Sequence, residues 1–278
     1  MSPRSESARA IEDSRPVGRL GHQAFYAVAA AVFVAAAAVT LSSSRMMNGG
    51  MPMPGGWTMG MAWMRMPGQT WASAAAMFTL MWAAMMVTMM LPSSVPMLLL
   101  YRRVAAFRAE RHVGALTALM AAAYFLVWTL FGGVAYTVGV SIAAAAMASP
   151  IVSRLIPIGA AAGLMIAGAY QLSPWKSSCL QHCRDPLEIF SSHLHRGPRG
   201  ALAIGFHHGL FCTGCCWALM LIQLVVGVMN LAAMVLVAVV IGAEKLAPNG
   251  KAVGRVVGIA SIAAGAFLIV RSASPLLP

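Results

Sequence analysis

Residues 115–140 read ALTALMAAAYFLVWTLFGGVAYTVGV, a run of 26 residues without a charged side chain. A helix needs about 20 predominantly apolar residues to cross the hydrocarbon core of a bilayer, so this stretch is long enough to span it. Other apolar runs of similar character occur along the whole chain. The sequence therefore predicts about seven membrane spans, near residues 24–41, 71–91, 115–140, 155–172, 201–228, 231–243 and 257–270.

The composition supports a membrane protein. Of 278 residues, 60% are apolar and 9% are charged, whereas roughly a quarter are charged in a typical soluble domain. We expect an all-α polytopic helix bundle formed by one domain, residues 23–272. A polar cytoplasmic tail, residues 1–22, precedes it. The first span has a long leader and a long apolar run, which favour an uncleaved anchor over a signal peptide.

The net charge of +12 follows the loops rather than forming a nucleic-acid patch. Four segments on alternate sides of the spans hold 15 of the 19 Lys and Arg residues: 4–19, 102–111, 176–199 and 245–255. Cytoplasmic loops carry this excess in membrane proteins. The N-terminus is therefore predicted inside and the C-terminus outside. The predicted surroundings are the lipid bilayer of the bacterial inner membrane, with no nucleic-acid partner.

A methionine-rich loop, residues 45–70, joins the first two spans on the predicted outer side. It contains eight methionines: Met46, Met47, Met51, Met53, Met59, Met61, Met64 and Met66. Thioethers are soft ligands that suit Cu(I). The M-x-M pairs make Met59, Met61, Met64 and Met66 candidate ligands, and Gly and Pro predict an irregular, adaptable loop. A lipid-contacting or partner-binding loop is the alternative, and the tryptophans of this segment agree with it.

The second span adds further methionines, of which Met85, Met86, Met89 and Met90 are candidate ligands. Methionine in a helix is also a common packing residue, and that interpretation stays open. Along a straight helix starting at Trp71, these residues would lie about 21–29 Å from the outer face. Pro92 and Pro96 are expected to end or kink this helix.

The segment FHHGLFCTGCCWALM, residues 206–220, places histidines and cysteines inside an apolar span. In a helix, residues i, i+3 and i+4 share a face. One face would carry His208, Cys212, Cys216 and Met220, with Cys215 one turn from Cys212. His207 would turn aside, although it remains a candidate ligand by type.

Four interpretations of this cluster compete. Buried free cysteines can be small apolar packing residues. A C-x-x-C pair can be a disulfide redox site, but the βαβ context of thioredoxin-like proteins is missing here. Haem and iron–sulfur ligand spacings are absent. A thiolate and imidazole metal site explains the grouping best, because a bound cation deprotonates thiols that apolar surroundings would keep neutral.

A second group lies in the loop sequence KSSCLQHCRD, where Cys179 and Cys183 are four residues apart and His182 stands beside them. The cytoplasm is reducing, so a stable disulfide is not expected there. These residues form either an exit site for metal or a pair of ordinary thiols. At the inner end of the sixth span, Glu244 and Lys245 are a plausible ion pair.

Several of these motifs resemble one known family. YQLSPWKSSCLQHCRDP, GLFCTGCCWALM, GVMNLAAM, AEKL and the methionine-rich MWAAMMVTMMLPSSVPM are similar to a family of uncharacterised bacterial integral membrane proteins described as predicted metal-binding. The resemblance extends from about residue 75 to 248. It implies a helical membrane fold and metal binding, and it implies no particular substrate.

We therefore expect a membrane protein that handles a soft metal ion, with Cu(I) favoured and zinc second. Capture, transport or delivery would use the Met and Cys/His ligands, and a metallochaperone or copper enzyme would be the partner. Motifs of hydrolases and phosphoryl-transfer enzymes are missing, which favours a binding or transport protein over an enzyme. The alternatives are a membrane thiol–disulfide oxidoreductase and a non-catalytic assembly or sensor protein.

Overall fold

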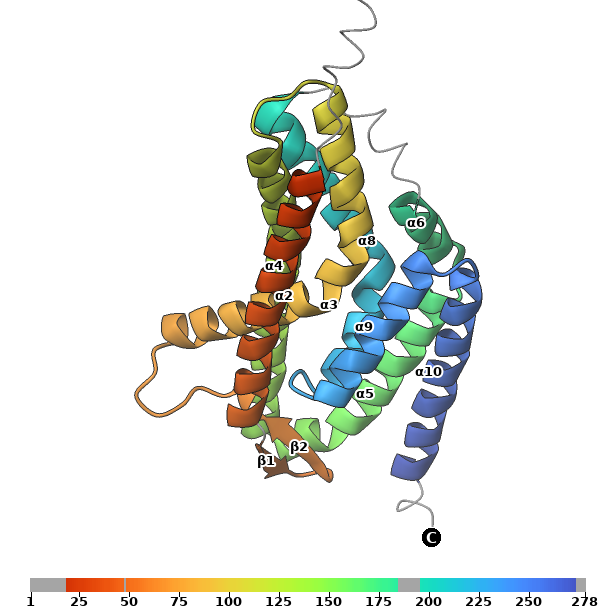
Figure 1. Ribbon diagram of the computed structural model, residues 1–278. Coiled ribbons are helices and arrows are strands. Elements are labelled where there is room, and N and C mark those ends of the chain that lie inside the picture. Colours follow the sequence, from red (N-terminus) through yellow and green to blue (C-terminus); the bar gives the residue numbers. More distant parts are fainter. Residues whose placement is uncertain (1–18, 48, 185–195, 274–278) are drawn as a thin grey trace, which may run out of the picture.

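The computed structural model describes residues 19–47, 49–184 and 196–273 as a helical bundle with one small hairpin (Figure 1). This confirms the predicted all-α polytopic fold. Residues 1–18 of the predicted polar tail lie outside the described residues. The elements are α2 (Arg19–Met46), β1 (Gly50–Met53), β2 (Trp57–Gly60), the 3-10 turn η1 (Met61–Trp63), α3 (Trp71–Phe107), α4 (Val113–Ala148), α5 (Pro150–Gln171), α6 (Pro174–Arg184), α8 (Gly197–Val226), α9 (Leu231–Leu246) and α10 (Gly250–Ala273).

Six helices of the described chain are long and apolar enough to cross a membrane: α2, α3, α4, α5, α8 and α10. The sixth predicted span corresponds to α9, whose 16 residues give a length of about 24 Å, short of the roughly 30 Å hydrocarbon core. It still runs lengthwise beside α10 (Figure 1). The start of α2 and the end of α10 therefore lie at opposite ends of the bundle (Figure 1). The location of the N-terminus on the cytoplasmic side remains a prediction.

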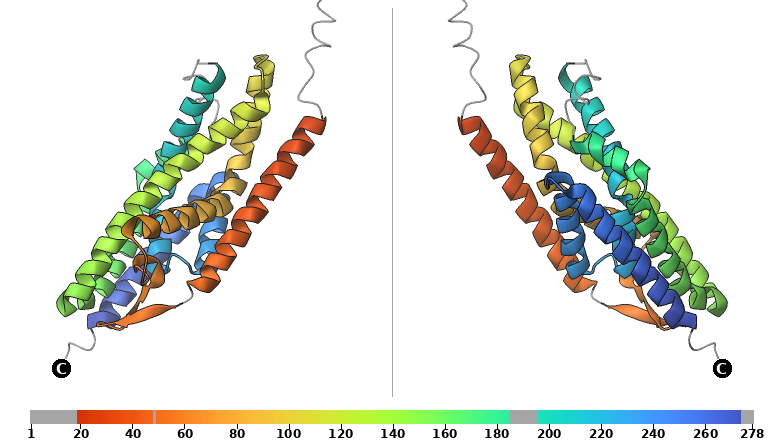
Figure 2. Two further views of the ribbon diagram at one scale, coloured as in Figure 1. Left: turned by 90° about the vertical axis from the view of Figure 1, so that its left-hand side faces the viewer. Right: turned by 90° about the vertical axis from the view of Figure 1, so that its right-hand side faces the viewer.

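The helix α3 bends sharply. Pro92 and Pro96 lie inside it, and each proline removes a backbone hydrogen bond and clashes with the preceding turn. Figures 1 and 2 show the first half of α3 crossing the bundle and the second half running along it. The predicted kink is confirmed, and the helix continues past both prolines to Phe107. The first half of α3, which carries these methionines, therefore does not run along the bundle axis, as the depth expected for them assumes.

Small residues set the closest helix contacts in the bundle. A Cβ on Gly265 of α10 would lie 2.6 Å from the carbonyl oxygen of Ala161 in α5, so a larger residue would push the two helices apart. A Cβ on Gly209 of α8 would lie 2.9 Å from Val127 in α4, and Gly205 is packed against the Met120 carbonyl of the same helix. Close approach through small residues is a common way for membrane helices to associate. These contacts fix α8, the helix of the cysteine cluster, against α4.

The methionine-rich loop forms an antiparallel hairpin, in contrast to the irregular loop expected. Met51 pairs with Met59, and Met53 pairs with Trp57. The Trp57 Nε1 donates a hydrogen bond of 2.9 Å to the carbonyl oxygen of Ser153, which anchors the hairpin on the start of α5. Met59 is only 1% exposed. Backbone pairing and this packing outweigh the local flexibility of Gly and Pro.

Candidate metal centre

The cysteine cluster of α8 is buried inside the bundle, and part of it faces α4. Cys212, Cys215 and Cys216 are each at most 1% exposed. From α4, the Tyr124 hydroxyl lies 2.9 Å from the Cys212 sulfur, and its ring stacks on the His208 imidazole with centroids 5.3 Å apart. The helical face predicted from the i,i+4 spacing is therefore directed into the bundle, where an aromatic hydroxyl adjoins its first sulfur.

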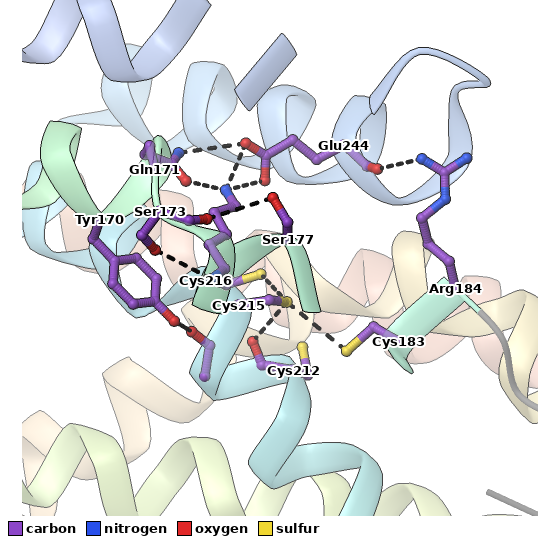
Figure 3. Close-up of polar contacts among 12 residues, drawn as sticks. Tyr170, Gln171, Ser173, Ser177, Cys183, Arg184, Cys212, Cys215, Cys216 and Glu244 are labelled. Carbon is purple, nitrogen blue, oxygen red and sulfur yellow. Dashed lines mark hydrogen bonds and ion pairs between the residues drawn. The ribbon is translucent and has the colours of Figure 1, made fainter. Parts of the chain in front are cut away.

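The helix α6 brings a second pair of cysteines to the same place. The sulfur of Cys215 lies 3.8 Å from that of Cys183 in α6 and 3.3 Å from that of Cys216. Figure 3 shows Cys183 facing the α8 cysteines across this short gap. Cys179 is close as well, since a Cβ on Gly214 would lie 3.5 Å from its sulfur. The two groups that the sequence presented separately thus form one cluster of thiols, all of them free.

A lysine completes the surroundings of Cys212. The Lys245 Nζ donates a hydrogen bond of 2.9 Å to the Cys212 sulfur from the last turn of α9. Its neighbour Glu244 pairs with Lys176 at 2.6 Å, and both side chains of that pair are at most 3% exposed. The expected Glu244–Lys245 ion pair is therefore replaced by two separate contacts. Lys176 and Glu244 also share Gln171, which ties α5, α6 and α9 together.

The adjacent histidines face different neighbours, because successive residues of a helix point about 100° apart. His208 is 4% exposed, and its Nδ1 is buried without a hydrogen-bond partner among the described residues. His207 turns toward α6, where its ring lies 5.2 Å from that of His182. The His182 ring stacks on Phe211 at 3.9 Å. His208 thus belongs to the Cys212 side of the site, and His207 and His182 to its α6 side.

The methionines divide into two groups. One buried cluster contains the α8 cysteines together with Met85, Met86, Met89, Met90 and Met220. Met81 and Met234 also belong to it, and Met47 and Met229 pack against it. The hairpin methionines lie elsewhere: Met59 is the centre of a separate cluster, with Met64 packed against that cluster. Met61 is half-buried and Met66 is exposed.

Sulfur spacing in this cluster fits a shared ion. Two sulfurs bound to one tetrahedral ion at about 2.3 Å each lie about 3.8 Å apart, and the Cys183–Cys215 sulfurs have this separation. No three His, Cys, Asp or Glu side chains in the described ranges are arranged to hold an ion together. The described geometry therefore brings a pair of these thiols, Cys183 and Cys215, to the spacing of two ligands of one ion.

Comparison with known proteins identifies the chain's family. A family model described as PpoB2, copper chaperone, matches residues 79–268, which is more than half of the chain. The chain belongs to the PpoB2 copper chaperone family. No match is found among curated proteins or among solved structures. Membership of a copper chaperone family supports copper handling in general, in agreement with the metal-binding family resemblance found in the sequence.

The extent of the PpoB2 match separates the two methionine groups. Residues 79–268 include all five cysteines and the candidate methionines of α3, whereas the hairpin, residues 50–60, lies before the matched region. The copper chaperone match therefore covers the thiol cluster and its buried methionines and leaves out the outer hairpin.

Two neighbours of the thiol cluster, Tyr124 and Lys245, do not follow from the sequence pattern. Tyr124 lies in an apolar span, where a tyrosine is an ordinary packing residue, and no local signal distinguishes it. The sequence gives little indication that Lys245 lies near the cysteines, because a lysine near the end of a span usually extends toward the membrane interface. Here it points inward to Cys212.

Proposed function

We propose that the protein is a multi-pass membrane chaperone for Cu(I), located in the bacterial inner membrane, that passes the ion along sulfur ligands to a copper-requiring partner. The observation that carries this proposal is the approach of Cys183 in α6 to Cys215 in α8, beside a buried cluster of methionines. Soft thiolate and thioether ligands select Cu(I).

The difference in burial between the α8 and α6 thiols places the exit of the proposed sulfur path at α6. The methionines Met85, Met86, Met89 and Met90 are at most 3% exposed, and the α8 cysteines are buried to the same degree. Cys179 and Cys183 are only half-buried. An ion held first by thioethers would gain thiolate ligands at Cys212 and Cys216, and then reach Cys215 and Cys183. Each thiol loses a proton when it binds the ion and regains one when it releases it.

The charge distribution favours release toward the cytoplasmic side. The helix α6 lies in a segment rich in Lys and Arg, which the positive-inside rule assigns to the cytoplasm. The partner that receives the ion there would be a soluble metallochaperone or a copper enzyme. Capture on the outer side would use the exposed Met66 and the half-buried Met61 and Met64. The buried Met59 would mainly hold the hairpin in place.

A copper-loading experiment tests this function. The wild-type protein and a Cys212→Ser/Cys215→Ser/Cys216→Ser variant would be purified in detergent under reducing conditions, and bound copper and zinc quantified after incubation with each metal. A Met97→Leu/Met120→Leu variant is the control, because these buried methionines belong to a different cluster. We expect copper to be retained by the wild type and the control and lost from the serine variant.

The same measurement separates the competing functions. If the wild-type protein retained zinc in preference to copper, the proposed cargo would be zinc instead of Cu(I). Negligible metal in the wild type would overturn the proposal and favour a thiol–disulfide oxidoreductase, for which the neighbouring sulfurs of Cys215 and Cys183 would be the redox pair. Reduction of a quinone or a small disulfide by the wild-type protein would then be the assay.

A further inference from the structure

A cationic cavity lies beside the thiol cluster, between α6 and the start of α10. Its volume is about 630 Å³, within the roughly 300–1,000 Å³ range of small-molecule sites. Three cationic side chains line it, Arg184 from α6 and Lys251 and Arg255 from α10, together with Gln181 and Asn249. Acidic side chains are absent from its described lining. The cavity therefore concentrates positive charge and hydrogen-bond donors.

Arg184 is held at the edge of this cavity by neutral groups. Its guanidinium donates hydrogen bonds to the carbonyl oxygens of Glu244 at 3.1 Å and Ala247 at 2.8 Å, and Figure 3 shows the first of these contacts. The Glu244 carboxylate is bound by Lys176 instead. These hydrogen bonds fix the position of Arg184. The Glu244 carboxylate does not neutralise its charge.

Lys251 and Arg255 lie four residues apart, on one face of α10. Both side chains are exposed, and neither makes an ion pair with a described residue. Like charges at this spacing destabilise a helix. They also adjoin the N-terminus of a 24-residue helix, which adds partial positive charge. An anion in the cavity would relieve this repulsion.

We infer that this cavity binds a phosphoryl-bearing anion that bridges α6 and α10. The anion would accept hydrogen bonds from Lys251 and Arg255 of α10, which are well suited to phosphate oxygens, and from the side-chain amide of Gln181 in α6. Its source is either the headgroup of an anionic phospholipid or free phosphate. By its location at the arginine- and lysine-rich end of the bundle, the site would sit at the level of the inner headgroups.

Occupation of this site has a consequence for the thiols. Leu180, Gln181 and Arg184 of α6 border the cavity, while Cys183 of the same helix contacts Cys215 in α8. An anion joining α6 to α10 would therefore hold α6, and with it Cys183, against the α8 cysteines. The binding itself does not depend on whether the protein carries copper, so it can be tested separately.

The test measures anion binding directly in the full chain. A Lys251→Gln/Arg255→Gln variant removes two cavity charges. An Arg103→Gln/Arg199→Gln variant removes two exposed charges from the same predicted side of the membrane, outside the cavity, and is the matched control. In one arm, native mass spectrometry counts phosphatidylglycerol adducts against phosphatidylcholine adducts. In the other, thermal unfolding in phosphatidylcholine nanodiscs is followed with inorganic phosphate or with chloride at equal ionic strength.

We expect the cavity variant to bind phosphatidylglycerol about tenfold more weakly than the wild type, and the control to keep wild-type binding. Stabilisation by inorganic phosphate, lost only in the cavity variant, would instead identify the soluble anion as the ligand. The inference fails if neither anion binds, or if the control variant loses binding to the same extent as the cavity variant. Monodisperse elution of both variants shows that they fold.

Discussion

The ammonium nitrogen of Lys245 lies 2.9 Å from the sulfur of Cys212, inside a bundle of apolar helices. A Cu(I) ion held by two thiolates would carry a net charge of −1, and an isolated charge is costly where water is excluded. The nearby ammonium would offset that charge at short range. In the proposed Cu(I) site, Lys245 would therefore act as a countercharge rather than as a ligand.

Replacing Lys245 by Leu should weaken Cu(I) binding while leaving the sulfurs in place and adding no new ligand. We expect a loss of roughly tenfold in affinity, about 1.4 kcal/mol, measured by competition with a chromogenic Cu(I) chelator. Lys245→Arg should keep most of the affinity because it keeps the charge. Arg103→Leu removes an exposed charge near the end of α3 and is the control. Equal affinities of Lys245→Leu and the wild type would exclude the countercharge role.

The contact between Cys183 and Cys215 predicts a specific disulfide. In a Cys179→Ser/Cys212→Ser/Cys216→Ser variant, a small-molecule disulfide should oxidise the two remaining thiols; the reagent takes up two electrons and the thiols release two protons. Peptide mass mapping would identify the bond. A variant that keeps only Cys179 and Cys212, whose sulfurs make no contact in the described structure, should oxidise far more slowly. Similar rates in both variants would contradict the arrangement of α6 on α8.

The sequence predicted the helices well because a membrane imposes a strong constraint on them. Every backbone polar group must be paired inside the hydrocarbon, so long apolar runs form helices. The effect of Pro92 and Pro96 on α3 was also local and therefore predictable. The hairpin at residues 50–60 was not predicted, because its strands have four residues each and depend on packing against α4 and α5.

Prediction of the site was limited by distance along the chain. The face carrying His208, Cys212 and Cys216 follows from helical spacing within α8. The approach of Cys183 depends on how α6 folds back onto α8, about 30 residues away, and no periodicity reveals it. The predicted ion pair between Glu244 and Lys245 does not form, because adjacent residues of a helix point in different directions. Glu244 instead contacts Lys176, and Lys245 contacts Cys212.

The buried methionines of α3 should affect copper transfer more than stability. Met86→Leu/Met90→Leu removes two thioethers from the cluster that contains the cysteines, and a Leu for Met exchange usually costs less than about 1.5 kcal/mol. We expect slower loading of Cu(I) from a Cu(I)–chelator complex onto the cysteines in a stopped-flow measurement, with nearly unchanged thermal unfolding. Met97→Leu/Met120→Leu makes the same chemical change in another cluster. A transfer rate lowered equally in both variants would assign the α3 methionines to packing alone.

The buried pair of Lys176 and Glu244 should hold α6 in position. Glu244→Ala leaves the Lys176 ammonium without its carboxylate, and breaking a buried pair costs about 3–5 kcal/mol, reduced here by the remaining contact with Gln171. We expect a lower unfolding temperature and slower formation of the Cys183–Cys215 disulfide. Lys176→Met/Glu244→Leu removes both charges and should recover much of the stability, because apolar replacement of a buried pair is often neutral. If Glu244→Ala left the unfolding temperature and the disulfide rate unchanged, the pair would have no part in positioning α6.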